Sequence, residues 1–204
     1  SFTLLKDNKP VTSIRMNIPG IHNVNNALAA IASCHTLGCD IESIKKGIKK
    51  FTGTNRRFEL KGMVNNIRVV DDYAHHPSEV SATLNAAKNS SSSRVWCVFQ
   101  PHTYTRTKSL LDDFAVSFGS SDFVIVTDIY AAREADSGDI HAQMLVDKIK
   151  SQGQNVQYIP DFKSIVGYLL ENANPGDMII TMGAGDIYKV GEMFLKEGRI
   201  MAVG

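Results

Sequence analysis

Apolar runs and amphipathic stretches alternate through the last three quarters of the chain. Short runs of mostly β-branched and aromatic residues predict five strands, at 67–70, 95–99, 123–126, 156–159 and 178–181. Apolar positions at helical spacing predict helices at about 78–87, 107–118, 142–150, 162–171 and 186–195. Continuous apolar strands that alternate with helices are typical of a parallel sheet covered on both faces. The pattern therefore predicts an α/β fold with a doubly wound, mostly parallel sheet.

The first fifty residues follow a different pattern. Two short strands are expected at 2–5 and 12–16, and two helices at about 23–37 and 41–51. Two strands and two helices bury little surface on their own, so we interpret this segment as the end of a larger domain. The stretch 53–62, which has a glycine at each end, is the expected joint. We therefore predict domains at 1–54 and 55–204.

Charge divides the chain near the same place. The whole chain has 22 Lys and Arg against 21 Asp and Glu, a net charge of +1. Residues 1–57 hold nine basic and three acidic side chains, whereas the rest holds thirteen basic and eighteen acidic ones. Such a difference in sign favours two folding units. The near-neutral total argues against a general nucleic-acid binder, and we expect no nucleic-acid partner.

The cysteines and the first residues bear on location. The three cysteines form no C-x-x-C pair, which favours buried thiols in a reducing compartment over a disulfide framework or a zinc site. No apolar run approaches the roughly 18 residues that a membrane span needs. The polar N-terminus does not resemble a signal peptide. We therefore expect a cytoplasmic protein with no membrane partner, and the initial Ser suggests a piece of a longer chain.

Polar residues collect where the predicted strands end. The segments after the first, second, third and fifth of these strands are rich in His, Asp, Arg and Gly, and they span 71–77, 100–106, 128–134 and 183–186. The turns at the opposite ends of the strands, such as 89–93 and 152–155, contain only Ser, Asn, Gln and Gly. Ligands of doubly wound folds bind at the carboxyl ends of the strands. The sequence therefore predicts a functional site at this edge.

Two of these segments suggest anion binding. Gly183 and Gly185 could begin a dinucleotide-binding turn, but the third glycine is missing, so a close approach of the backbone to an anionic ligand is the favoured interpretation. His102 and Arg106 could hold a carboxylate, because Arg donates two parallel hydrogen bonds to one. The less favoured alternative is two solvated residues near the start of a helix.

The first segment suggests metal ligands. Asp71, Asp72, His75 and His76 are residue types that bind divalent cations. Adjacent residues rarely point at one ion, however, and we predict no permanent metal site. The favoured interpretation is that one of these carboxylates contacts a ribose or a transiently bound Mg²⁺.

Five motifs occur in an order that is typical of one family. They are His22-Asn23-x-x-Asn26, Arg56-Arg57-Phe58-Glu59, Asp71-Asp72-Tyr73-Ala74-His75-His76-Pro77, Phe99-Gln100-Pro101-His102-x-Tyr104-x-Arg106-Thr107 and Gly183-Ala184-Gly185-Asp186. Together they resemble the Mur ligases of bacterial peptidoglycan synthesis, and within that family the ligases that add L-alanine. The resemblance covers essentially the whole chain. It implies the end of a central ATPase domain followed by a C-terminal Rossmann-like domain.

The resemblance also implies a reaction. Such ligases use ATP and Mg²⁺ to phosphorylate the lactyl carboxylate of UDP-N-acetylmuramate, and the amine of L-alanine then displaces phosphate through a tetrahedral intermediate. No G-x-x-x-x-G-K-[ST] phosphate loop occurs in the 204 residues, so we expect them to be inactive alone, with the main Mg²⁺ ligands elsewhere. Two alternatives stay open: a sister ligase that attaches recycled murein tripeptide, and a stand-alone module that binds a nucleotide or an amino acid.

For ATP, the resemblance implies four contacts. Asn23 and Asn26 would hydrogen-bond the adenine, because a side-chain amide offers both a donor and an acceptor. Arg57 would approach the phosphates, and Asp72 would approach the ribose. These residues lie on both sides of the expected joint, so ATP would hold the two domains together.

For L-alanine, the resemblance implies a cationic clamp. His102 and Arg106 would fix the carboxylate and leave the amine facing the reaction centre. The same pocket would be lined by Tyr73, His75 and His76. Some relatives have Arg at the position of Thr103, and its absence here bears on how fully the carboxylate is clamped.

Overall fold

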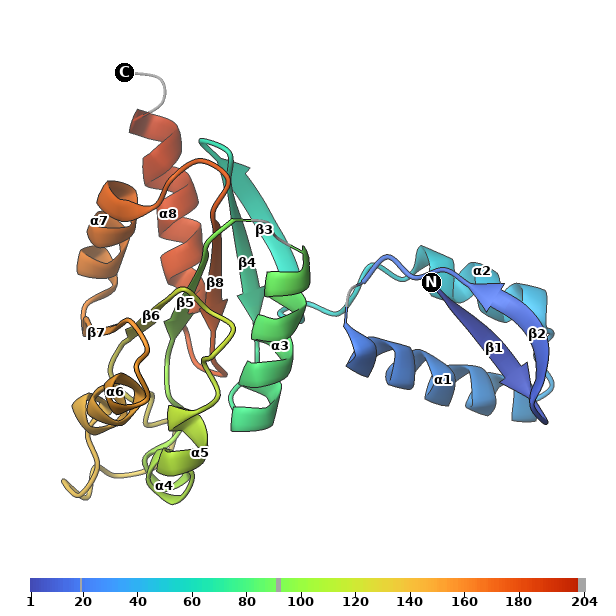
Figure 1. Cartoon of the computed structure of the whole chain (residues 1–204), viewed down its shortest axis with the longest axis horizontal. Coiled ribbons are helices and arrows are strands. Elements are labelled where there is room, and N and C mark those ends of the chain that lie inside the picture. The colour runs from blue at the N-terminus through green and yellow to red at the C-terminus, as the bar shows by residue number, and fades with distance from the viewer. Residues whose placement is uncertain (19, 91–92, 202–204) are drawn as a thin grey trace. The chain divides into compact units, whose positions relative to one another are not determined.

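The chain folds into two compact units, as the computed structural model shows (Figure 1). The structure describes residues 1–18, 20–90 and 93–201. The units are Ser1–Asn55 and Arg56–Gly204, so the chain divides within the stretch 53–62. Among the described residues, no helix has the length and apolar character to cross a bilayer.

The first unit is a β-hairpin packed on two helices. Its elements are β1 (Phe2–Lys6), β2 (Lys9–Ile14), α1 (Ile21–Thr36) and α2 (Ile41–Lys50). The two strands pair antiparallel. A small core fills the space between hairpin and helices, and its buried members are Ile14, Ile31 and Ile44. All four elements predicted for this segment are confirmed.

The second unit is built on a six-stranded sheet with the order β3-β4-β8-β5-β6-β7. Its strands are β3 (Glu59–Val64), β4 (Ile67–Asp72), β5 (Val95–Phe99), β6 (Phe123–Val126), β7 (Val156–Tyr158) and β8 (Met178–Met182). Strands β4 to β8 are parallel to one another, and β3 pairs antiparallel with β4. The last strand of the chain therefore lies between β4 and β5. The predicted α/β fold with a mostly parallel sheet is confirmed.

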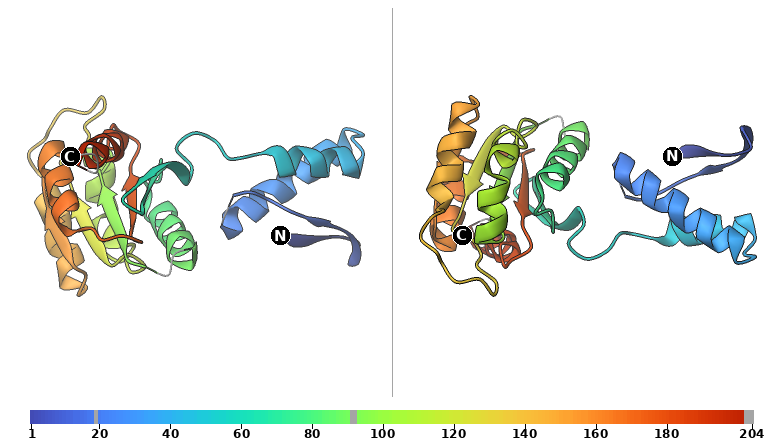
Figure 2. Two further views of the ribbon diagram at one scale, coloured as in Figure 1. Left: turned by 90° about the horizontal axis from the view of Figure 1, so that it is seen from above. Right: turned by 90° about the horizontal axis from the view of Figure 1, so that it is seen from below.

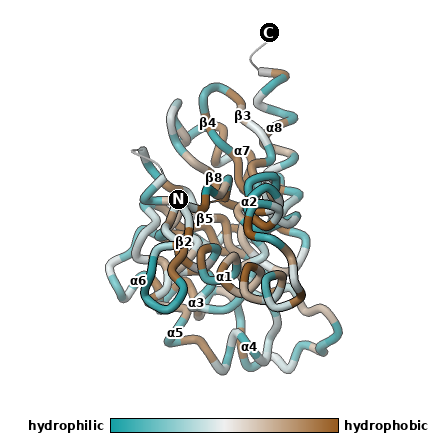
Figure 3. The backbone as a smooth tube through the Cα atoms, turned by 90° about the vertical axis from the view of Figure 1, so that its right-hand side faces the viewer, coloured by the Kyte–Doolittle hydropathy of each residue, from teal (hydrophilic) through white to brown (hydrophobic). Residues whose placement is uncertain are grey.

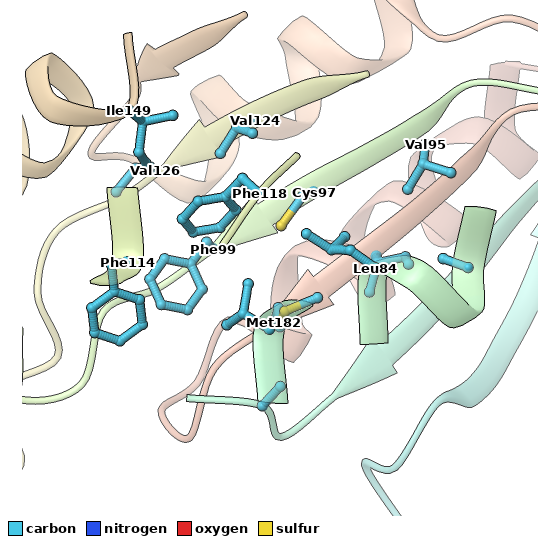
Figure 4. Packing of buried hydrophobic residues seen from close by; sticks show 14 of the residues in the cluster. Leu84, Val95, Cys97, Phe99, Phe114, Phe118, Val124, Val126, Ile149 and Met182 are labelled. Atoms are coloured by element: carbon cyan, nitrogen blue, oxygen red, sulfur yellow. The ribbon is translucent and has the colours of Figure 1, made fainter. Parts of the chain in front are cut away.

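Helices cover both faces of this sheet (Figure 2). One face packs against α3 (Pro77–Ser90), α5 (Leu111–Ala115) and α6 (Ala142–Ser151), and the other against α7 (Phe162–Asn172) and α8 (Tyr188–Met201). Along β5, the side chains of Val95, Cys97 and Phe99 enter the first layer, where Phe99 meets Phe114 and Phe118 (Figure 4). Because neighbouring strand residues point to opposite faces, Trp96 and Val98 enter the second layer.

Hydrophobic and hydrophilic segments accordingly alternate along the backbone, as Figure 3 shows. The buried strands β5 and β8 have no exposed position, whereas the edge strands β3 and β7 have some. A strand that is buried on both faces appears in a sequence as a continuous apolar run. This is why the central strands were predictable.

Two expectations about the elements were wrong. The stretch 53–62 is not joint throughout, because β3 begins at Glu59. As an edge strand with Leu60 and Met63 exposed, it lacks the apolar run of the central strands. The predicted helix at 107–118 is instead two short helices, α4 (Tyr104–Ser109) and α5, which are separated at Leu110, where φ is −114° and ψ is 21°.

Candidate functional site

Four loops meet at the carboxyl edge of the sheet. They follow β4, β8, β5 and β6, in the order in which these strands lie side by side. Backbone hydrogen bonds join each loop to the next: Gly183 N donates to Asp72 O at 3.1 Å, and Gln100 N donates to Met182 O at 2.9 Å. Tyr130 N donates to Pro101 O at 2.9 Å. The insertion of β8 thus brings together residues that lie more than a hundred positions apart in the sequence.

Arg56 ties the β8 loop to β4. Its Nη1 donates to Gly185 O at 3.0 Å, and its Nη2 donates to Gly183 O at 2.7 Å. Its Nε donates to Oδ2 of Asp71 at 2.8 Å, and the guanidinium carbon lies 4.9 Å from the ring centres of Tyr73 and Tyr188. Each of the three guanidinium nitrogens donates a hydrogen bond within this unit, so Arg56 has a structural role. The sequence offered it only as the first member of an Arg pair.

The two glycines of the β8 loop allow a close backbone approach. A Cβ added at Gly185 would lie 2.3 Å from Oε1 of Gln100 and 2.7 Å from Cγ of Tyr130. At Gly183, which has a φ of 150°, it would lie 2.7 Å from Gln100 O. The Gln100 side chain then accepts from Ile187 N at 3.2 Å. The glycines are therefore required by the packing of the β5 and β6 loops, which is a structural reason that does not depend on an anionic ligand.

Asp72 is almost fully buried, with 5% of its surface exposed. Its Oδ1 accepts from Ala74 N at 2.7 Å and its Oδ2 accepts from Phe58 N at 2.8 Å. Burial raises the pKa of Asp72, although these two hydrogen bonds and the charge of Arg57 oppose the rise. The Asp72 carboxylate thus joins the segment before β3, at Phe58, to the loop after β4, at Ala74. Its predicted contact with a ribose stays a prediction.

Arg57 contrasts with its neighbour Arg56. Its side chain is 51% exposed, and its nearest charge partner is Glu79, with 3.7 Å between Nη1 and Oε1. Its guanidinium carbon lies 5.9 Å from the ring centre of Tyr73, which is itself exposed. Arg57 therefore presents a cation to solvent beside the β4 loop.

Glu79 organises the two histidines of the β4 loop. Its Oε2 accepts from His75 N at 3.0 Å and from His76 N at 3.3 Å. Burial alone would raise the pKa of Glu79, but these hydrogen bonds and the charges of His75 and Arg57 outweigh it and lower the pKa. The ring of His76 turns toward Ser78, with 2.9 Å between Nδ1 and Oγ, so the structure gives His76 a local role at the start of α3.

His75 and His102 come together across the edge. Nδ1 of His75 lies 2.9 Å from Tyr73 O, and the ring centre lies 5.9 Å from that of His102. Burial, followed by the charges of Arg106 and His75, lowers the pKa of His102, which favours its neutral ring. In the described part of the chain, Nδ1 of His102 is the one buried side-chain nitrogen or oxygen without a hydrogen-bond partner.

Arg106 lies in the first turn of α4 and is partly exposed. Its Nη1 donates to His102 O at 3.1 Å, which ties the guanidinium to the loop. Among the described residues, no carboxylate lies within 4.0 Å of the Arg106 guanidinium, so this cation has no ion pair there. An uncompensated cation beside a neutral imidazole suits an anionic group such as a carboxylate.

Two of the predicted residues belong to the other unit. Asn23 and Asn26 lie on α1 of the first unit, and Asn26 is exposed. Metal ligands are also not gathered: in the ranges that the structure describes, no group of three or more His, Cys, Asp or Glu is placed to hold an ion. The carboxylate of Asp71 is engaged by Arg56 and by Thr181 Oγ1 at 2.7 Å. The residues of this edge therefore do not fit a Mg²⁺ site by themselves.

Comparison with known proteins agrees with this architecture. The family model "Mur ligase, glutamate ligase domain" matches residues 56–185. The UDP-N-acetylmuramate–L-alanine ligase of Acetivibrio thermocellus is 62% identical over 203 residues, a match that covers 100% of this chain and 43% of that protein. The chain thus spans less than half the length of this relative.

Two solved structures are similar along nearly the whole chain. A UDP-N-acetylmuramate-alanine ligase from Thermotoga maritima has a TM-score of 0.82 and 29% identity, over 96% of this chain and 42% of that one. A murein peptide ligase from Psychrobacter arcticus has a TM-score of 0.69 and 26% identity, over 91% of this chain and 38% of that one. Since the family model matches well over half of its residues, the chain belongs to the Mur ligase family.

Proposed function

We propose that this chain is the C-terminal part of an ATP-dependent ligase that joins L-alanine to UDP-N-acetylmuramate. The observation that carries the proposal is a cationic corner in which His102 and Arg106 of the β5 loop meet His75 of the β4 loop. The 62% identity to a ligase of that name supports the choice of substrates. The lower similarity to a murein peptide ligase makes the tripeptide-adding alternative the weaker one.

The corner suits the carboxylate of an amino acid. A fixed guanidinium attracts the carboxylate and repels the ammonium form of the amine, so the neutral amine is left free to attack. Arg106 keeps N–H groups available beyond the one that it donates to His102 O. A neutral His102 adds a hydrogen bond and leaves the charge to Arg106. In this proposal Tyr73 and His75 line the same corner. His76 is assigned to it on the basis of the family resemblance alone.

The proposal assigns four residues of this chain to ATP. In this proposal Asn23 and Asn26 contact the adenine, Arg57 the phosphates and Asp72 the ribose. The solvent-exposed cation of Arg57 supports its part. Mg²⁺ would neutralise the phosphates, mainly through ligands outside these 204 residues. Exclusion of water from the site would protect the acyl phosphate from hydrolysis.

The test is an amino-acid panel with the longer protein that contains this chain. Phosphate release from ATP in the presence of UDP-N-acetylmuramate is expected with L-alanine and not with murein tripeptide. Preference for the tripeptide would favour the sister ligase. No turnover with any amino component, together with binding of alanine or ATP, would favour a stand-alone binding module. The 204 residues alone are expected to show no turnover above a protein-free control, since they lack the phosphate loop.

A further inference from the structure

The loop after β6 braces the loop after β5 at two places. The first is Tyr130, whose backbone N–H donates to Pro101 O at 2.9 Å. The ring of Tyr130 stacks on the ring of His102, with 5.6 Å between their centres and an angle of 12° between their planes. This contact supports His102 from one side, but it does not reach Arg106.

The second brace is Glu134, which contacts the segment between His102 and Arg106. Its Oε2 accepts from Thr105 N at 2.9 Å, and its Oε1 accepts from the hydroxyls of Thr103 and Thr105. These three hydrogen bonds lower the pKa of Glu134 to about 2, so the carboxylate stays charged at neutral pH. Thr103 directly follows His102 and Thr105 directly precedes Arg106, the two residues expected to contact substrate.

The turn that carries Glu134 is itself fixed. Glu134 N donates to Ala131 O at 3.0 Å, and Ala132 between them has a φ of 54°. A positive φ costs a residue with a Cβ roughly 1 kcal/mol, so other contacts must hold this conformation. The turn and its three hydrogen bonds to the threonines therefore form one unit with the β5 loop.

We propose that Glu134 is a positioning residue for the amino-acid substrate, which it serves by setting the relative placement of His102 and Arg106. This rests on the proposed function. The carboxylate has no ion pair with Arg106 among the described residues, so it fixes the backbone around the cation without neutralising it. A small displacement of a substrate-holding group is enough to slow a reaction strongly.

Steady-state kinetics of the longer ligase test this, with alanine, ATP and UDP-N-acetylmuramate varied in turn. Glu134→Ala removes all three hydrogen bonds and is expected to lower kcat/KM for alanine at least tenfold, mainly through KM, with the KM values of the other substrates within twofold. Glu134→Gln keeps one carbonyl oxygen as an acceptor, and an intermediate loss is expected. Because Gln preserves the size of the side chain, this second variant serves if Glu134→Ala does not fold.

Asp161→Asn is the matched control. Asp161 is an exposed carboxylate that, like Glu134, accepts hydrogen bonds at the start of a helix, here from Ser164 N at 2.8 Å and from Ser164 Oγ at 3.0 Å in α7. It is expected to lower stability without a specific effect on alanine. The inference is overturned if the Glu134 variants leave alanine kinetics unchanged, or if they weaken all three substrates equally. Failure of the proposed function is distinct, because the unsubstituted enzyme would then not use alanine at all.

Discussion

At the scale of single residues, neighbours in the sequence have separate tasks. Arg56 is enclosed by two tyrosine rings and donates to Asp71 and to two carbonyl groups, whereas Arg57 is exposed. Asp71 and Asp72 are both buried but hold different partners. Residue type therefore does not distinguish a charge with a structural role from one that is available to a ligand. The hydrogen-bond and ion-pair partners of each side chain make that distinction.

Arg106→Lys is expected to impair alanine use in the longer ligase. Lysine keeps the charge but loses the planar fork, and a charge-assisted hydrogen bond contributes roughly 1.5 to 3 kcal/mol. We expect kcat/KM for alanine to fall about ten- to a hundredfold, with little change in KM for ATP. Lys108→Ala is the control, because Lys108 lies on the same helix but pairs with Asp139. An unchanged alanine kcat/KM in Arg106→Lys would make Arg106 a bystander.

Substitutions at Asp72 and at Arg57 are expected to have different effects on stability and on ATP binding. Asp72→Asn places an amide where two backbone N–H groups need acceptors, so the free energy of unfolding should fall by about 1–3 kcal/mol. Arg57→Ala should change it by less than about 0.5 kcal/mol, because the ion pair with Glu79 is exposed. Arg57→Ala should nevertheless raise KM for ATP more than KM for alanine. Urea unfolding and steady-state kinetics measure these effects. A larger rise in KM for alanine would contradict the placement of the nucleotide.

At the scale of elements, the β5 loop and α4 depend on a partner that is distant in sequence. In α4 the N-cap residue Thr103 makes no side-chain capping bond, and the carboxylate of Glu134 accepts from Thr105 N instead. By contrast, α2 and α7 are capped locally by Asp40 and Asp161. A cap supplied from 29 residues away couples two loops, which a local cap cannot do.

The contribution of Glu134 to stability is expected to depend on pH. Its pKa falls from an ordinary 4.5 to about 2 on folding, through the hydrogen bonds from Thr103 and Thr105. A carboxylate with a lowered pKa stabilises the fold fully above its unfolded pKa, and that contribution is lost as the pH falls toward 2. The stability difference between the natural protein and Glu134→Gln should thus be constant between pH 6 and 8 and shrink from pH 5 to pH 3. Urea midpoints across this range measure it, and a difference that does not change with pH would contradict the assignment.

At the scale of the whole molecule, the two units differ in core size. The first has a core cluster whose buried members are Ile14, Ile31 and Ile44, whereas the second has a layer of core on each side of its sheet. A segment with so small a core is marginally stable alone. Its exposed apolar side chains, which include Ile21 and Leu37, agree with its interpretation as the end of a larger domain.

Heating of the 204-residue chain is therefore expected to unfold the first unit before the second. The chain has one tryptophan, Trp96, which is buried in the second unit and stacks on Phe123 with 4.0 Å between ring centres. Tryptophan fluorescence thus reports the second unit alone, while far-UV circular dichroism reports both. The first loss of ellipticity should precede the fluorescence transition by about 5 °C or more. Coincident transitions would show one cooperative unit.

The sequence alone determined the parts of this protein that depend on local pattern. The five parallel strands and most of the helices follow from apolar periodicity, and the motifs pointed to the family. It missed β3 because an edge strand with one solvated face has no continuous apolar run. It joined α4 to α5 because nothing local marks the break at Leu110.

Only the tertiary structure decided which polar side chains meet. The insertion of β8 between β4 and β5 brings Arg56 to Gly183 and Gly185, and it leaves Arg57 exposed. The adjacency of β5 and β6 brings Glu134 to Thr103 and Thr105. The pairing order of strands is a long-range property, because it arises from how crossover connections close the sheet and not from the residues within any one strand. The partners of Arg56 and Glu134 could therefore not be predicted from their local sequence.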